Sequence, residues 1–98
     1  MPEFCDPFVV LNANRKITHE ELVRLIRLAV ASEYETVQIY SQIIEATRND
    51  DAKKVFTDAM DDEKVHAGKF LRLIKEIQPD EFEYYDKGAK EVEAMLQK

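Results

Sequence analysis

Apolar side chains recur in steps of three and four along two long segments of the chain, which is the spacing of one face of an α-helix. In the first segment this face carries Leu22, Ile26, Ala29, Glu33, Val37, Tyr40 and Ile44. In the second it carries Ala52, Phe56, Ala59, Glu63, His66, Phe70, Leu73 and Ile77. No segment shows the alternation of a strand. The pattern therefore predicts helices from about His19 to Thr47 and from about Asp51 to Ile77.

The ends of these helices carry local signals of their own. Thr18 and Glu21 have the spacing of a capping box, in which each side chain accepts a hydrogen bond from the backbone of the other. Asn49 or Asp50 can cap the second helix within a short polar turn. Pro79 ends that helix and favours the start of a third one.

We therefore predict an all-α fold, in which an antiparallel helical hairpin is followed by a short C-terminal helix. The chain is expected to be a single domain over residues 1–98. Residues 1–17 form an extended N-terminal arm, residues 18–77 the hairpin and residues 79–97 the last helix. Long helices in so short a chain usually need partner chains to cover their apolar faces, so we expect at least a dimer.

The composition narrows the range of partners. The net charge of −6 disfavours nucleic acid, which is bound through Lys and Arg, and favours cations. The single cysteine, Cys5, excludes a disulfide framework within the chain and a cluster of Cys metal ligands. The chain has neither an apolar run that could cross a membrane nor a secretory signal, so a cytoplasmic location is expected.

Three ionisable residues interrupt the apolar faces of the two long helices: Glu33, Glu63 and His66. In an antiparallel hairpin that turns near Asn49, residues whose numbers sum to about 97 lie level, at a rise of about 1.5 Å per residue. Glu33 then faces the Glu63–His66 turn, roughly 22 Å from the bend. The three side chains are therefore expected to converge at one height.

Two converging carboxylates are costly inside a protein unless a cation binds them. Carboxylate oxygens with one imidazole nitrogen suit iron or manganese, and residues three apart, such as Glu63 and His66, can reach one ion. Di-iron four-helix bundles take a Glu from each of two helices and a Glu-x-x-His from each of the other two. This chain has one of each, so two chains would complete a di-iron site.

Less specific interpretations of the same residues remain open. Glu63 and His66 are also explained by a surface acid and a core histidine, and Glu33 by an acid at the bundle edge. Tyr40, two turns after Glu33, is either a core tyrosine or a residue that hydrogen-bonds a ligand carboxylate or donates an electron.

Residues 31–40 (ASEYETVQIY), 62–66 (DEKVH) and 88–93 (GAKEVE) resemble those of the encapsulated ferritins, short relatives of ferritin and rubrerythrin that reside inside encapsulin shells. The resemblance covers roughly residues 15–95. It implies a ferritin-like four-helix bundle made by two chains, with a di-iron ferroxidase centre at their interface. Glu33, Glu63 and His66 of each chain would be the iron ligands, with Tyr40 as a further catalytic residue.

The resemblance also implies an open, ring-like homo-oligomer such as a decamer, which relies on an encapsulin nanocompartment for iron storage and detoxification. Acidic residues beside the first ligand guide metal in that family. Here Glu35 is kept as a possible accessory ligand, but Ser32 replaces another acid. Two other functions stay open: a rubrerythrin-like di-iron peroxide reductase, and a helical oligomerisation module without enzymatic activity.

Overall fold

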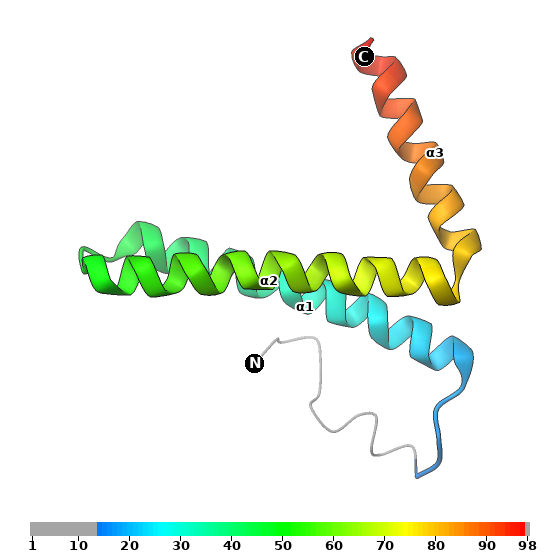
Figure 1. The fold of residues 1–98 in the computed structure, drawn as a ribbon, viewed down its shortest axis with the longest axis horizontal. Helices are drawn as coiled ribbons and strands as arrows, with labels where there is room; N and C mark the ends of the chain where they lie inside the picture. The colour runs from blue at the N-terminus through cyan, green and yellow to red at the C-terminus, as the bar shows by residue number, and fades with distance from the viewer. Residues whose placement is uncertain (1–13, 98) are drawn as a thin grey trace.

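The computed structural model describes residues 14–97, which form three helices: α1 (His19–Ala46), α2 (Asp50–Ile77) and α3 (Pro79–Leu96) (Figure 1). The all-α expectation is confirmed, and no strand occurs within the described residues. The predicted helix ends differ from these bounds by no more than a residue. The predicted N-terminal arm and Cys5 lie outside the described residues, apart from the last part of the arm from Asn14 on. No helix in the described part of the chain is long and apolar enough to span a membrane.

The helix ends are stabilised by the predicted caps. The Thr18 hydroxyl accepts a hydrogen bond from the Glu21 backbone N–H (3.2 Å), and the Glu21 carboxylate accepts one from the Thr18 backbone N–H (2.9 Å). The Asn49 side chain caps α2 by accepting from the Ala52 N–H at 2.9 Å. Pro79 occupies the first turn of α3, where its missing N–H costs no helical hydrogen bond.

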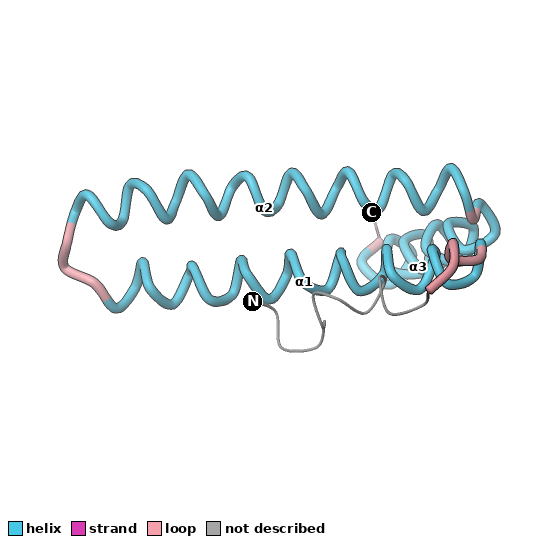
Figure 2. Tube along the Cα trace, turned by 90° about the horizontal axis from the view of Figure 1, so that it is seen from below, coloured by secondary structure: helices cyan, strands magenta, loops and turns pink. Residues whose placement is uncertain are grey.

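The long helices α1 and α2 lie antiparallel and side by side over their whole length (Figures 1 and 2). The buried residues between them are Val23, Ile26, Val30, Ala67 and Ile74. Leu22 and Leu73, predicted on the inner faces, are instead 38% and 42% exposed. Val23 and Ile74 take the inner positions because the contact follows a repeat of three and a half residues, as in a coiled coil.

Helix α3 leaves the end of the hairpin at a steep angle and projects away from it (Figure 1). None of its residues is buried. Only its first turns contact the hairpin, where Phe82 packs against the core cluster of Ile26, Val30 and Ile74. The radius of gyration, 17.0 Å, exceeds the value of about 13 Å typical of a compact domain of this length. The single chain therefore leaves large surfaces uncovered.

Candidate metal centre

Glu33 of α1 and the Glu63–His66 pair of α2 meet midway along the hairpin. Residues 26, 30, 33 and 37 follow one face of α1, so Glu33 continues the stripe that packs against α2. Glu63 and His66 lie one turn apart on α2, and their side chains therefore project together. The structure thus brings together all three residues that the sequence predicted as metal ligands.

The distances within this group fit the binding of a cation better than direct pairing. His66 Nδ1 lies 3.7 Å from Glu33 Oε1 and 3.6 Å from Glu63 Oε2, which is too long for hydrogen bonds. One ligand atom from each residue lies within 4.8 Å of the other two. Ligands at about 2.1 Å from one ion lie about 3 Å apart, so small side-chain rotations would bring these atoms into place.

The second carboxylate oxygen of Glu33 carries the strongest signal for a ligand. Glu33 Oε2 is buried and has no hydrogen-bond partner among residues 14–97, and the Glu33 side chain is 15% exposed. An unpartnered buried carboxylate oxygen costs free energy that a protein rarely tolerates without a compensating group. Carboxylate oxygens beside an imidazole nitrogen form a donor set that suits iron or manganese.

The group is enclosed on one side and open on the other. The side chains of Glu33 and Glu63 are 15% and 22% exposed, whereas that of His66 is 44% exposed. Helical spacing places Leu22 on the same stripe of α1 as Glu33, about three turns away, and Val55 and Leu73 on the stripe of His66, about three and two turns away. These three apolar residues are themselves exposed at 38%, 66% and 42%. Exposed apolar side chains therefore lie along the same stripes of the two helices as the ligands.

Tyr40, the further predicted catalytic residue, lies on the inner side of α1 toward the hairpin bend. Its ring packs edge-on against Phe56 of α2, with ring centroids 5.3 Å apart. Within residues 14–97 no hydrogen bond joins its hydroxyl to Glu33 or Glu63, so this contact is that of a packed core tyrosine. Its catalytic role stays a prediction.

Glu35, the predicted accessory ligand, is not part of the group formed by Glu33, Glu63 and His66. It follows Glu33 by two positions, which places it on a different face of α1. Beside it, the Thr36 hydroxyl donates a hydrogen bond to the backbone carbonyl of Ser32 at 3.0 Å. An accessory role for Glu35 would therefore be carried out away from the three ligands, and it stays a prediction.

One polar cluster escaped the sequence interpretation. Arg27 of α1 forms an ion pair with Glu81 of α3, and Glu81 also accepts a hydrogen bond from Tyr85. Only the spacing of Glu81 and Tyr85, one helical turn apart, is visible in the sequence. Arg27 lies 54 positions away and is brought in by the angle between the helices.

The comparisons with known proteins agree with this fold. A family model described as rubrerythrin matches residues 10–97. The chain belongs to the rubrerythrin family. It shares 26% identity with the crystal structure of the encapsulated ferritin domain from Pyrococcus furiosus, with a TM-score of 0.84 over 94% of this chain and 93% of that one. The fold is therefore ferritin-like, and the resemblance to encapsulated ferritins is confirmed.

Two similar sequences carry names that refer to encapsulins. The chain is 40% identical over 67 residues to the encapsulin nanocompartment cargo protein EncC of Myxococcus xanthus, covering 68% of this chain and 52% of that protein. It is 27% identical over 86 residues to the ferritin-like–encapsulin shell fusion protein of Pyrococcus furiosus, covering 88% of this chain and 25% of the fusion. The chain thus spans about half of one relative and a quarter of the other.

Proposed function

We propose that this protein is a ferroxidase that oxidises ferrous iron with oxygen at a di-iron site formed between two subunits. The observation that carries the proposal is the convergence of Glu33, Glu63 and His66 around a buried carboxylate oxygen without a partner. Ferrous iron is the substrate, and two ions would be held by the three residues of each of two chains. At this site two ferrous ions would give one electron each to one oxygen molecule, which with two protons would leave as hydrogen peroxide, with two ferric ions as the other product.

Each residue of the group has a distinct part in holding the substrate. Glu33 offers two oxygens from the inner face of α1, where low exposure strengthens its attraction for a cation. Glu63 supplies a second carboxylate, and His66 a neutral nitrogen that orients the pair from one turn away. Carboxylates stabilise the ferric product more than the ferrous substrate, so the ligand set favours oxidation. Three ligand residues from each chain leave coordination positions on the two ions open for oxygen.

A second copy of the chain would complete the site. The three ligands of one chain are fewer than two ions require, and the two-chain arrangement supplies the set found in di-iron bundles. The exposed apolar residues Leu22, Val55 and Leu73 share the helix stripes of the ligands and would be covered in such a dimer. Dimers of this kind would then assemble into a ring-like oligomer such as a decamer.

The names of two relatives support a proposal for the place of action. One of them is named as an encapsulin cargo protein and the other as a fusion with an encapsulin shell. We infer that this chain also associates with an encapsulin shell, inside a cytoplasmic nanocompartment. Iron oxidised there would be stored in the shell, which removes reactive ferrous iron from the cell.

The proposal is tested by Glu63→Ala, with oxygen-dependent oxidation of ferrous iron as the measurement. The variant should lose rapid oxidation, because one carboxylate of each half-site is removed. Glu76→Ala is the matched control, since Glu76 is an exposed acid on the same helix. Unchanged oxidation by the Glu63→Ala protein would overturn the proposal.

A peroxide reductase is the second candidate, because the matching family model is that of rubrerythrin. Such an enzyme would use the same three ligands but oxidise ferrous iron faster with peroxide than with oxygen. The chain has one cysteine, so electrons would have to come from an external donor. Comparing initial rates with the two oxidants at equal concentration separates these functions. An oligomerisation module without activity would accelerate oxidation of ferrous iron with neither oxygen nor peroxide, and its assembly would not depend on metal.

A further inference from the structure

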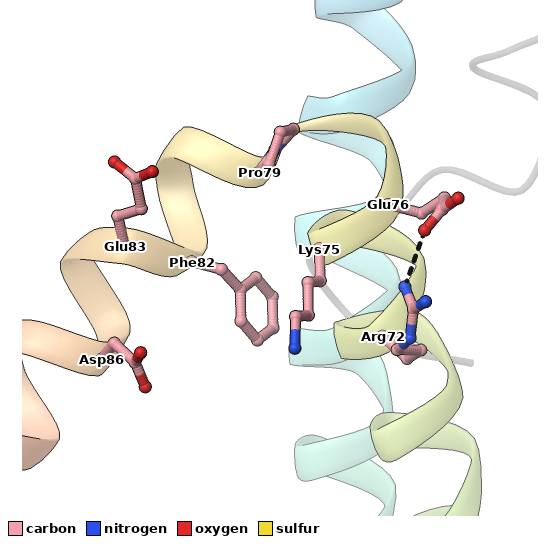
Figure 3. Close-up of a pocket in the computed structure, with 7 residues that line it drawn as sticks. All are labelled: Arg72, Lys75, Glu76, Pro79, Phe82, Glu83 and Asp86. Carbon is pink, nitrogen blue, oxygen red and sulfur yellow. Dashed lines mark hydrogen bonds and ion pairs between the residues drawn. The ribbon is translucent and has the colours of Figure 1, made fainter.

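The junction between the hairpin and α3 is held by few contacts. Helix α3 buries none of its residues, and its first turn is the part that lies against the hairpin. A groove of about 310 Å³ separates α3 from the end of α2, with Lys75 on one wall and Glu83 and Asp86 on the other (Figure 3). Side chains do not fill this groove. The packing between α2 and α3 therefore leaves room for α3 to change its angle.

Glu81 joins α3 to α1, although α3 follows α2 in the chain. Arg27 Nε of α1 lies 3.0 Å from Glu81 Oε1 and 3.2 Å from Oε2, and Arg27 Nη2 donates to Oε1 as well. The Tyr85 hydroxyl donates to Glu81 Oε2 from the next turn of α3. The Glu81 side chain is 12% exposed, unlike most acids of this chain. A bidentate guanidinium–carboxylate pair fixes orientation as well as distance.

Two neighbouring contacts restrict the same junction. Phe82 packs against the hairpin core and meets the Tyr85 ring edge-on, with centroids 5.0 Å apart. His19 at the start of α1 hydrogen-bonds the Gln78 side chain, in the link between α2 and α3, at 2.9 Å. The Arg27 and Tyr85 hydrogen bonds also hold the pKa of the Glu81 carboxyl below its usual range, so this residue stays charged.

We propose that the hydrogen bonds of Glu81 set the angle between α3 and the hairpin, and we call this role of Glu81 a latch. Glu81 receives hydrogen bonds from Arg27 of α1 and from Tyr85 of α3, so its loss removes the hydrogen bonds that tie α3 to α1. Leu96 lies about 22 Å along the helix from Glu81, so a change of about 10° would move that end by about 4 Å. Val92, Met95 and Leu96 near that end are 50%, 76% and 59% exposed, so the latch decides where these apolar side chains are presented.

The test measures the distance between spin labels on α2 and α3 in the full chain. Labels are attached through Lys64→Cys and Glu93→Cys in a Cys5→Ser background. Labelled protein is mixed with a large excess of unlabelled protein, so that each measured distance lies within one chain. Glu81→Gln and Arg27→Gln should each shift or broaden the distance distribution by about 3 Å, the displacement that about 10° of swing gives at residue 93.

Two further variants complete the test. Glu76→Gln is the matched control, because Glu76 pairs with Arg72 on an exposed face of α2 (3.1 Å), and it should leave the distribution unchanged. The exchange Arg27→Glu with Glu81→Arg should narrow the distribution again. If Glu81→Gln loses helical circular dichroism, Arg27→Gln decides, because it leaves α3 unchanged. Identical distributions for Arg27→Gln and the parent protein would overturn the latch. The readout does not involve iron, so this result is independent of the ferroxidase proposal.

Discussion

At the scale of single residues, burial of the Glu33 carboxylate affects both the stability of the fold and the binding of a cation. Its buried oxygen has no partner in the structure, although it lies on the face that holds the hairpin together. A charge in this position weakens the hairpin unless a cation binds, because desolvation is not compensated by hydrogen bonds. Without metal, the parent protein should therefore be less stable than a variant with an apolar residue at position 33.

Replacing this charge should have opposite effects with and without metal. Glu33→Leu should stabilise the metal-free protein by about 1–2 kcal/mol, since a buried carboxylate oxygen without a hydrogen-bond partner is removed. The same variant should lose the stabilisation that Mn²⁺ gives the parent protein. Denaturant unfolding with a chelator and with Mn²⁺ measures both effects. Glu45→Leu, at an exposed acid near the end of α1, serves as the control. A Glu33→Leu protein that is less stable without metal would contradict this account.

A second prediction at this scale concerns pH and Glu21. Hydrogen bonds from Arg15 and from the Thr18 backbone lower the pKa of Glu21 to about 2, from an ordinary value of 4.5. Because the pKa is lower in the folded state, the stabilisation is complete above pH 4.5 and disappears as the pH falls toward about 2. Thermal unfolding of the parent and of Glu21→Gln should therefore converge over this range. A stability difference that is constant from neutral pH to pH 2 would contradict the assigned role.

At the scale of helices, the ends were predictable because their signals are local. The Thr18–Glu21 capping box, the Asn49 cap and Pro79 each act over a few residues, and each appears as expected. The inner faces were less predictable. Leu22 and Val23 are both apolar, and only the packing of α1 against α2 selects Val23 for the core.

Some features of the candidate site could likewise be predicted from the sequence, and others could not. The convergence of Glu33 with Glu63 and His66 followed from the hairpin register, because an antiparallel pair fixes which residues lie level. The 44% exposure of the His66 side chain could not be predicted from the register, because it depends on where the site lies between the buried face and the surface of the hairpin. The contact between Arg27 and Glu81 also depends on the angle of α3, which no local pattern specifies.

The cap of α2 provides a prediction at the scale of one helix. Asn49→Ala should destabilise the protein by about 1 kcal/mol, because the Ala52 N–H loses its hydrogen bond at the start of the helix. Asn49→Asp keeps an acceptor oxygen and should leave stability nearly unchanged. Denaturant unfolding without metal measures both. Equal stability of the Ala and Asp variants would show that the cap contributes nothing.

At the scale of the whole molecule, the single chain is an open structure with an incomplete site. Its hairpin is thin, α3 buries no residue, and apolar side chains on the helix stripes of the three ligands are exposed. Each of these features is expected of a chain that completes its core and its metal ligands in an assembly. Association and metal binding should therefore be linked.

Metal removal should weaken the association of two chains. If the ions bind only the assembled site, free metal at about 100 times its dissociation constant strengthens association about 100-fold for each ion bound, and so about 10,000-fold for two. Sedimentation equilibrium with Mn²⁺ and with a chelator measures this linkage. His66→Ala should remove most of the difference between the two conditions. Association that is equally strong in both conditions would favour the oligomerisation module instead.

The central claim is that two chains share one di-iron site, and anomalous scattering at the iron absorption edge tests it most directly. Crystals of the iron-loaded protein should show two iron peaks between paired chains, each close to Glu33, Glu63 and His66. Iron absent from these residues, or bound by them within one isolated chain, would contradict the account.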